Sequence, residues 1–201
     1  MKEKNFYEAI ESRRSIYGLS NEPVISDEKI EEIIKFAVKH TPSAYNSQSG
    51  RVVLLLGEHH KKFWDITEET LKRVVPPEQD FTPTAEKMQS FRNGYGTVLF
   101  FEDESVVKGL QEKFPLYQDK FPQYANESNG MLQYIIWTAL EVEGFGASLQ
   151  HYQPLIDDEV KKEWGIPKEW KLHAQMPFGK PTAPPKVKEF VPIEERVKIF
   201  K

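Results

Sequence analysis

The segment between residues 126 and 142 constrains the fold of this chain more than any other. It has the pattern of a long helix with apolar side chains on almost every side: Met131, Leu132, Ile135, Ile136, Ala139 and Leu140. Such a helix belongs in a core or in a large subunit interface. The chain has 201 residues, enough to bury a core without disulfides. We therefore expect residues 1–201 to form one domain and to assemble as a homodimer through this helix.

The other hydrophobic patterns alternate between helices and short strands. Apolar spacing predicts helices near residues 6–12, 27–40, 60–75, 84–91, 104–114 and 155–164, with Ser26 capping the second. Short apolar runs predict buried strands at 52–56, 97–101 and 170–176. The stretch 115–125 resists assignment, and prolines from residue 181 open an extended tail. Because helices outnumber the strands and flank each of them, we expect an α+β sandwich with a small sheet.

Composition argues against several classes of protein. A formal net charge of -4 and a pI near 5.8 disfavour a nucleic-acid binder that relies on a basic surface. The absence of cysteine excludes disulfides, thiolate nucleophiles and cysteine metal sites. The amino terminus shows no apolar signal-peptide core, and runs such as 52–56 are too short to span a bilayer. We expect a cytoplasmic protein without a nucleic-acid or membrane partner.

Two polar segments indicate the chemistry of a ligand. Arg13, Arg14 and Ser15 follow the first helix, and their guanidinium forks and hydroxyl suit a phosphate group. Residues 41–48 are rich in hydroxyl and amide groups, which offer donors and acceptors to a heteroaromatic ring with mixed edges. Together the two segments suggest a phosphate-tailed cofactor.

The sequence offers no convincing catalytic side chain or metal site. His59 and His60 are adjacent, so on a helix they point about 100° apart and do not form a metal pair. Glu141 and Glu143 diverge for the same reason and make no acid–base pair. We expect the imidazole of His151 to be buried and satisfied by the backbone.

Four short motifs occur in an order and spacing that resemble the nitroreductase family. They are Arg13-Arg14-Ser15, the segment 42–48, the segment 144–150 that begins Gly-Phe-Gly-Ala, and the segment 178–181 that reads Phe-Gly-Lys-Pro. Residues 93–103 and 179–185 point to the compact subgroup related to the yeast fatty-acid-repression protein. The resemblance implies an FMN-dependent oxidoreductase fold, a homodimer with a mainly antiparallel sheet, and a C-terminal tail that extends onto the partner subunit.

The resemblance also implies roles for individual residues. Arg13, Ser15 and Lys180, beside Gly179, would hold the FMN phosphate, and Arg14 would lie on the ribityl or ring edge. From the second subunit, four residues would approach the flavin with Gln48 close by: Pro42, Ser43, Ala44 and Asn46. Leu149, Gln150 and His151 would pass the central ring, with a backbone N–H there facing flavin N5.

This chain departs from many relatives at two positions. Tyr17 stands where a basic residue is common, which leaves open which cation faces flavin N1 and O2; Lys87 and Arg92 are the candidates. Ser49-Gly50 replaces a Pro-Trp pair, so a substrate-stacking role there is in doubt.

The expected activity follows from the resemblance. NADH or NADPH would pass hydride to the flavin and leave, and a nitroaromatic or quinone would then be reduced in the same place. The flavin carries this chemistry without a catalytic side chain. An alternative is a flavin-binding regulator of oxidative-stress response or lipid signalling with little turnover. A third class, an interaction domain without a cofactor, would be colourless when purified.

Overall fold

A central antiparallel sheet organises the computed structural model, which describes residues 4–201. The strand order is β1-β5-β3-β2, and the short β4 pairs with β5 off this path. Every pairing between these strands is antiparallel. The strands are β1 (Leu19–Ser20), β2 (Gly50–Leu56), β3 (Gly96–Asp103), β4 (Gly146–Ala147) and β5 (Trp170–Pro181).

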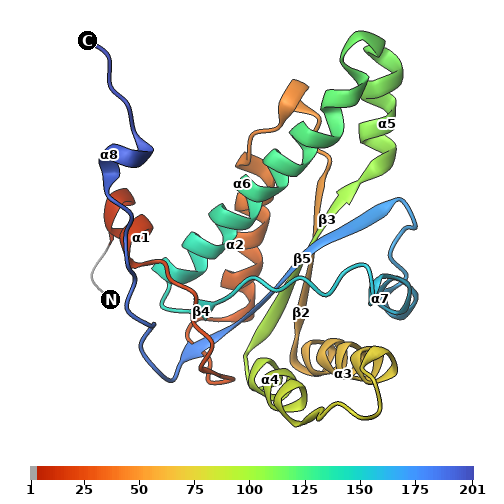
Figure 1. Ribbon diagram of the computed structural model, residues 1–201, viewed down its shortest axis with the longest axis vertical. Coiled ribbons are helices and arrows are strands. Elements are labelled where there is room, and N and C mark those ends of the chain that lie inside the picture. The colour runs from red at the N-terminus through yellow and green to blue at the C-terminus, as the bar shows by residue number, and fades with distance from the viewer. Residues whose placement is uncertain (1–3) are drawn as a thin grey trace.

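Helices cover both faces of this sheet (Figure 1). The longer helices are α2 (Asp27–His40), α3 (Gly57–Val74), α4 (Thr82–Arg92), α5 (Glu104–Lys113), α6 (Phe121–Val142) and α7 (Asp157–Trp164). The shorter ones are α1 (Phe6–Ser12), α8 (Ile193–Arg196) and the 3-10 turns η1 (Ala44–Asn46) and η2 (Pro115–Lys120). Helices α2 and α6 lie against one face, and α3, α4 and α7 lie against the other. The predicted α+β class is confirmed.

Strand β3 explains why both faces need helices. Residues 97–101 are fully buried. Successive side chains of a strand point to opposite faces, so Val98 and Phe100 enter the core with α2 and α6. Leu99 and Phe101 enter the second core, which α3, α4 and α7 cover. A continuous apolar run therefore becomes the centre of a three-layer fold.

The long helix α6 buries one stripe against the sheet and leaves another uncovered. Leu132, Ile136 and Leu140 are buried in the first core. Met131 and Tyr134 remain 41% and 39% exposed in the single chain. One stripe of the helix therefore lies in a core, one of the two expected environments, and the other is an apolar surface that stays partly exposed in the single chain. Within residues 4–201, no helix is long and apolar enough to cross a membrane.

Local signals set most element boundaries. Ser26 is the N-cap of α2, and its hydroxyl accepts a hydrogen bond from the Lys29 N–H. The unassigned stretch 115–125 forms η2 and the first residues of α6, because Phe121 packs beside Val107 and Ala125 in a third small core. Sequence periodicity missed this start because the aromatic spacing there is set by tertiary packing.

The C-terminal tail leaves the body of the molecule after β5 and runs past α1 (Figure 1). Several of its apolar side chains are exposed, including Val187 at 94%, Phe190 at 74% and Phe200 at 93%. The tail has no core of its own within this chain.

His60 is a buried titratable group in the second layer. Its side chain is 1% exposed, and Nδ1 is hydrogen-bonded to the Thr97 hydroxyl at 2.8 Å. The same hydroxyl accepts a hydrogen bond from the Trp64 indole N–H at 2.9 Å. Burial lowers the pKa of His60 from 6.5 to about 4. The folded protein therefore holds this imidazole neutral at pH values where an unfolded chain would protonate it.

We expect His60 to make folding stability depend on pH. Between about pH 6.5 and pH 4 the unfolded chain binds a proton that the folded chain does not, so stability falls as the pH falls through this window. One such proton corresponds to a slope of about 1.4 kcal/mol per pH unit. Urea unfolding at several pH values should show a weaker slope for His60→Gln, and an unchanged slope for the exposed control His40→Gln. Equal slopes for wild type and His60→Gln would refute the assignment.

Candidate functional site

Arg13 lies at the C-terminal end of α1 against the exposed stripe of α6. Its guanidinium carbon is 4.2 Å from the ring centroid of Trp137 and 5.8 Å from that of Tyr134. Cation–π contacts of this kind hold a guanidinium in place without neutralising its charge. Arg13 Nε is buried and has no hydrogen-bond partner among the described residues. A fixed cation with an unused donor fits an anionic group such as a phosphate. The aromatic platform of Tyr134 and Trp137 was not identified from sequence, although the two residues lie three apart on one helix face.

The motif after α1 pairs with the motif after α6. Ser15 forms a parallel bridge with Ala147, and the Ile16 N–H donates to the Ala147 carbonyl at 2.9 Å. On the opposite edge of the same extended segment, the N–H groups of Ser148 and Gln150 donate to Pro177 and Gln175 of β5.

Backbone groups of an extended segment alternate between its two edges, so the Leu149 N–H points to the edge that carries Ser15. Two residues of strand separate this N–H from Ala147 by roughly 7 Å. The segment that carries Arg13 and Ser15 therefore lies along the same edge as the Leu149 N–H.

The C-terminal tail returns to Arg14. The Arg14 guanidinium donates a hydrogen bond to the backbone carbonyl of Lys186 at 2.5 Å. A cavity of about 500 Å³ opens here between α1, the end of α6 and the start of the tail, with Ser12, Phe145 and Pro181 in its lining. Lys186 was missed from sequence, because only the fold returns the tail to the residues after α1.

Gly179 and Lys180 lie in β5 opposite β4 and β1. Gly179 faces Gly146 in the register, and a Cβ atom at Gly179 would lie 2.5 Å from the Ser20 carbonyl oxygen. Glycine is required there by close backbone approach. Lys180 forms an ion pair with Glu22 and its side chain is half exposed. It would have to exchange this partner to bind a phosphate.

Lys87 and Arg92, the two candidates expected to face flavin N1 and O2, differ in their surroundings. Arg92 is paired with Asp65 at 2.8 Å and also with Glu68, so its charge is already compensated. Lys87 Nζ lies 5.7 Å from the ring centroid of Tyr152, the residue after His151, and Lys87 forms no ion pair within residues 4–201. Which of the two cations faces the ring stays a prediction. Tyr17 is 52% exposed.

His151 corrects one prediction. Its side chain is exposed, because the chain turns outward after Gln150 pairs with Gln175. The imidazole is therefore not the buried group that we expected.

The segment 42–48 is a strained turn. Tyr45, Asn46 and Gln48 have φ angles of 56°, 51° and 50°, in the left-handed region that only Asn of the three adopts readily. The Ser43 hydroxyl accepts from the Gln48 N–H at 2.9 Å. The Tyr45 ring packs against Phe114 at a centroid distance of 4.9 Å. Such strain costs of order 1–3 kcal/mol per residue and is typical of functional sites.

A second cavity lies below this turn. It has a volume of about 570 Å³, within the range of small-molecule sites, and runs between α2, β2 and α6. Pro42, Ser43 and Gln48 contribute to its lining.

The two halves of the expected cofactor site lie at opposite ends of α6. Tyr45 contacts Phe121 at the start of the helix, with ring centroids 5.5 Å apart, whereas Arg13 contacts Trp137 near its end. The axial rise between Phe121 and Trp137 is about 24 Å. The structure thus brings Arg13, Ser15 and Leu149 together but does not bring residues 42–48 to them within one chain.

Below the turn lies a buried carboxyl group that sequence analysis did not single out. Glu102 is 3% exposed and accepts from the Asn129 side-chain amide at 3.3 Å. Alternation along β3 could have predicted it, because Glu102 follows Val98 and Phe100 on the face that meets α6. Among residues 4–201, no cluster of three or more His, Asp or Glu side chains is arranged to hold a metal ion.

Comparison with known proteins identifies the family. The nitroreductase family model matches residues 10–180. Nitroreductase FRM2 of Saccharomyces cerevisiae is 35% identical over 193 residues, which cover 93% of each chain. Nitroreductase CinD from Lactococcus lactis, solved in complex with chloramphenicol, is 42% identical with a TM-score of 0.90, over 98% of this chain and 100% of that chain. A nitroreductase with bound FMN from Desulfitobacterium hafniense shares the fold at 18% identity and a TM-score of 0.68, over 97% of each chain. As the four motifs predicted, the chain belongs to the nitroreductase family.

Proposed function

We propose that the protein is an FMN-dependent NAD(P)H oxidoreductase that reduces nitroaromatic or quinone-type acceptors. The bridge between Ser15 and Ala147 carries the proposal, because it aligns a phosphate-type cluster and the Leu149 N–H along one edge. Arg13 and Ser15 would hold the phosphate, with Lys180 as a further cation. Lys87 would lie near the ring edge, where a positive group favours the anionic reduced state.

A second copy of the chain would complete the site. If two α6 helices pack antiparallel through the stripe of Met131 and Tyr134, the turn 42–48 of one subunit approaches Arg13 of the other. Ser43, Asn46 and Gln48 would then supply donors and acceptors to the ring edge. The apolar side chains of the C-terminal tail, exposed in the single chain, would then pack against the partner subunit.

When bound, FMN supplies a centre that accepts and returns hydride. The protein's part is to hold the phosphate, orient the ring with the Leu149 N–H, and leave one face open to donor and acceptor in turn. The relative CinD supports the acceptor class, since it has been solved with chloramphenicol and with 4-nitrophenol, both nitroaromatic compounds. Dependence on NADH or NADPH also favours a cytoplasmic location.

We expect Arg13→Ala to weaken FMN binding. The substitution removes charge-assisted hydrogen bonds worth roughly 1.5–3 kcal/mol, which corresponds to about 10- to 100-fold in affinity. Fluorescence titration of the apoprotein with FMN measures this, and Arg73→Ala, at an exposed ion pair on α3, serves as the control. Unchanged affinity in Arg13→Ala would exclude the phosphate assignment.

We expect a homodimer in solution at micromolar concentration. Met131→Glu places a charge in the proposed interface and should shift the mass to that of a monomer and release FMN. Val74→Glu is the matched control, because Val74 is similarly exposed, at 52%, on the opposite layer. Light scattering after size exclusion gives the mass. A wild-type monomer that retains FMN would contradict the arrangement.

We expect ping-pong kinetics, because the donor and acceptor would share one site over the ring. Double-reciprocal plots at several acceptor concentrations should give parallel lines. His151→Ala should retain most of the rate, since only the backbone of this segment is assigned a role. A loss of more than about 100-fold, near 2.7 kcal/mol of barrier, would show that the imidazole takes part. A protein that binds FMN but shows no turnover with NADH or NADPH would favour the alternative function, a flavin-binding regulator.

A further inference from the structure

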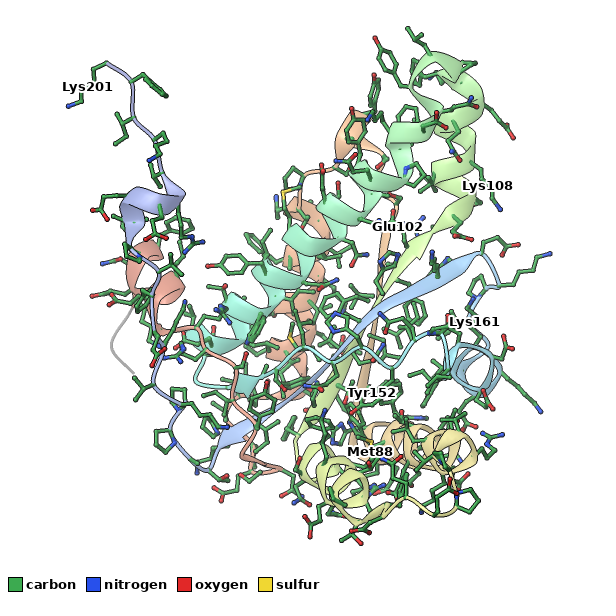
Figure 2. The ribbon with its side chains drawn as sticks, in the orientation of Figure 1. Met88, Glu102, Lys108, Tyr152, Lys161 and Lys201 are labelled. Atoms are coloured by element: carbon green, nitrogen blue, oxygen red, sulfur yellow. The ribbon has the colours of Figure 1, made fainter. Side chains whose placement is uncertain are left out.

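Glu102 is a buried acid that the proposed reaction has not used. Its carboxyl lies at the end of β3, opposite Gly50, and Figure 2 shows it in the body of the molecule beneath α6. The Asn129 amide donates to Oε2, whereas Oε1 is buried without a hydrogen-bond partner among the described residues. A buried carboxylate with a free oxygen is costly, and a proton on Oε1 removes that cost.

The same carboxyl lines a route to solvent. A cavity of about 130 Å³ lies between α5, the start of α6 and β5, with Glu102 in its lining. A water molecule in the liquid takes up about 30 Å³, and the cavity offers the polar groups that water needs. Lys108, on α5 in Figure 2, and His173 are among them.

On its other side Glu102 lies next to a pair of serine hydroxyls. Ser49 is buried and directly precedes Gly50, the register partner of Glu102, and its carbonyl accepts from the Asp103 N–H at 3.0 Å, so Ser49 lies beside Glu102. The Ser49 hydroxyl lowers the pKa of the Glu102 carboxyl, while burial, the larger effect, raises it above the usual range. Ser49 Oγ is 3.2 Å from Ser47 Oγ. Ser47 belongs to the turn that carries Asn46 and Gln48, the residues proposed to approach the partner's flavin. The hydroxyls thus connect a buried acid with the proposed reaction site.

We propose that Glu102, Ser49 and Ser47 form a relay that delivers a proton from the solvent-connected cavity to the acceptor held above the flavin. The relay rests on the proposed function. When a quinone accepts a hydride, it gains two electrons and one proton and becomes a monoanion. Glu102 then gives its proton to Ser49 as Ser49 passes its own to Ser47, and the Ser47 proton neutralises the product. Water in the cavity returns a proton to the Glu102 carboxylate, and the hydroxide that remains leaves through the cavity to solvent.

The charges around Glu102 are mixed. Arg51 on β2 lowers its pKa, and Asp103, which pairs with Arg51 at 3.0 Å, raises it. The cavity adds Lys171 and His173 from β5 and Glu104 and Lys108 from α5. Burial outweighs these opposing charges, so the group stays protonated to a higher pH than an exposed glutamate.

The test compares two acceptors on the FMN-loaded enzyme. Benzoquinone needs a delivered proton, whereas ferricyanide accepts only an electron. In Glu102→Gln, which keeps the size and polarity of the side chain, the ratio of the quinone rate to the ferricyanide rate should fall at least about tenfold. The quinone rate of the wild type should decrease at high pH and in D2O, and both dependences should weaken in Glu102→Gln. Ser49→Ala should produce the same fall while leaving the carboxyl in place.

Glu104→Gln is the matched control, since Glu104 lines the same cavity but lies outside the hydroxyl chain. A second readout requires no turnover: as the pH rises, the infrared carbonyl band of a protonated carboxyl group should persist in the FMN-free wild type beyond the range in which exposed glutamates ionise, and this persistence should be lost in Glu102→Gln. An unchanged acceptor ratio in both Glu102→Gln and Ser49→Ala, or no such persistence in the wild type, overturns the relay. Reduction of neither acceptor by the wild type overturns the proposed function and the relay with it.

Discussion

Strand β3 meets a different set of helices on each of its two faces, and its residues 97–101 are fully buried between them. A strand of this kind requires apolar layers on both sides, which α2 and α6 provide on one face and α3, α4 and α7 on the other. The placement of the site follows from this arrangement. Glu102, the residue before the last of β3, lies beneath the turn 42–48, and β5, the neighbour of β3, aligns the segment 146–150 beside Ser15. Both halves of the proposed site are thus anchored to one rigid sheet.

The halves differ in how the chain holds them. Arg13 lies on an aromatic surface, and the Leu149 N–H is directed by strand alternation, so this half needs no unusual backbone geometry. The turn 42–48 instead holds three non-glycine residues at positive φ, stabilised by the Ser43 hydroxyl and the packing of Tyr45 on Phe114. A rigid turn of this kind presents its amide groups in a fixed direction, as recognition of a planar ring requires. Because the halves lie far apart along α6, the proposed dimer would be needed to complete the site as well as to cover apolar surface.

Buried polar groups of this molecule fall into two kinds. His60 is held neutral by burial and its Nδ1 is bonded to Thr97, which fits a structural role in the second layer. Each of His60 and Glu102 keeps one buried atom without a hydrogen-bond partner among the described residues, but Glu102 also borders a cavity and lies beside two serine hydroxyls. A purely structural carboxyl could have been replaced by an apolar side chain of similar volume without loss of stability. The position of Glu102 therefore agrees better with proton supply than with packing.

The sequence by itself determined the α+β class, the capped helix after Ser26, the three main strands and the family, because these depend on local hydrophobic periodicity and on contiguous motifs. It also indicated Arg13 and Ser15 as a phosphate-type pair, although their role stays a prediction. Only the tertiary structure decided which side chains meet across the sheet. It showed that the charge of Arg92 is compensated by Asp65 and Glu68, unlike that of Lys87. It also showed that the side chain of His151 is exposed. It also brought Lys186 to Arg14 and placed Ser49 beside Glu102, since contacts between residues distant in the chain arise from packing and register and leave no local pattern.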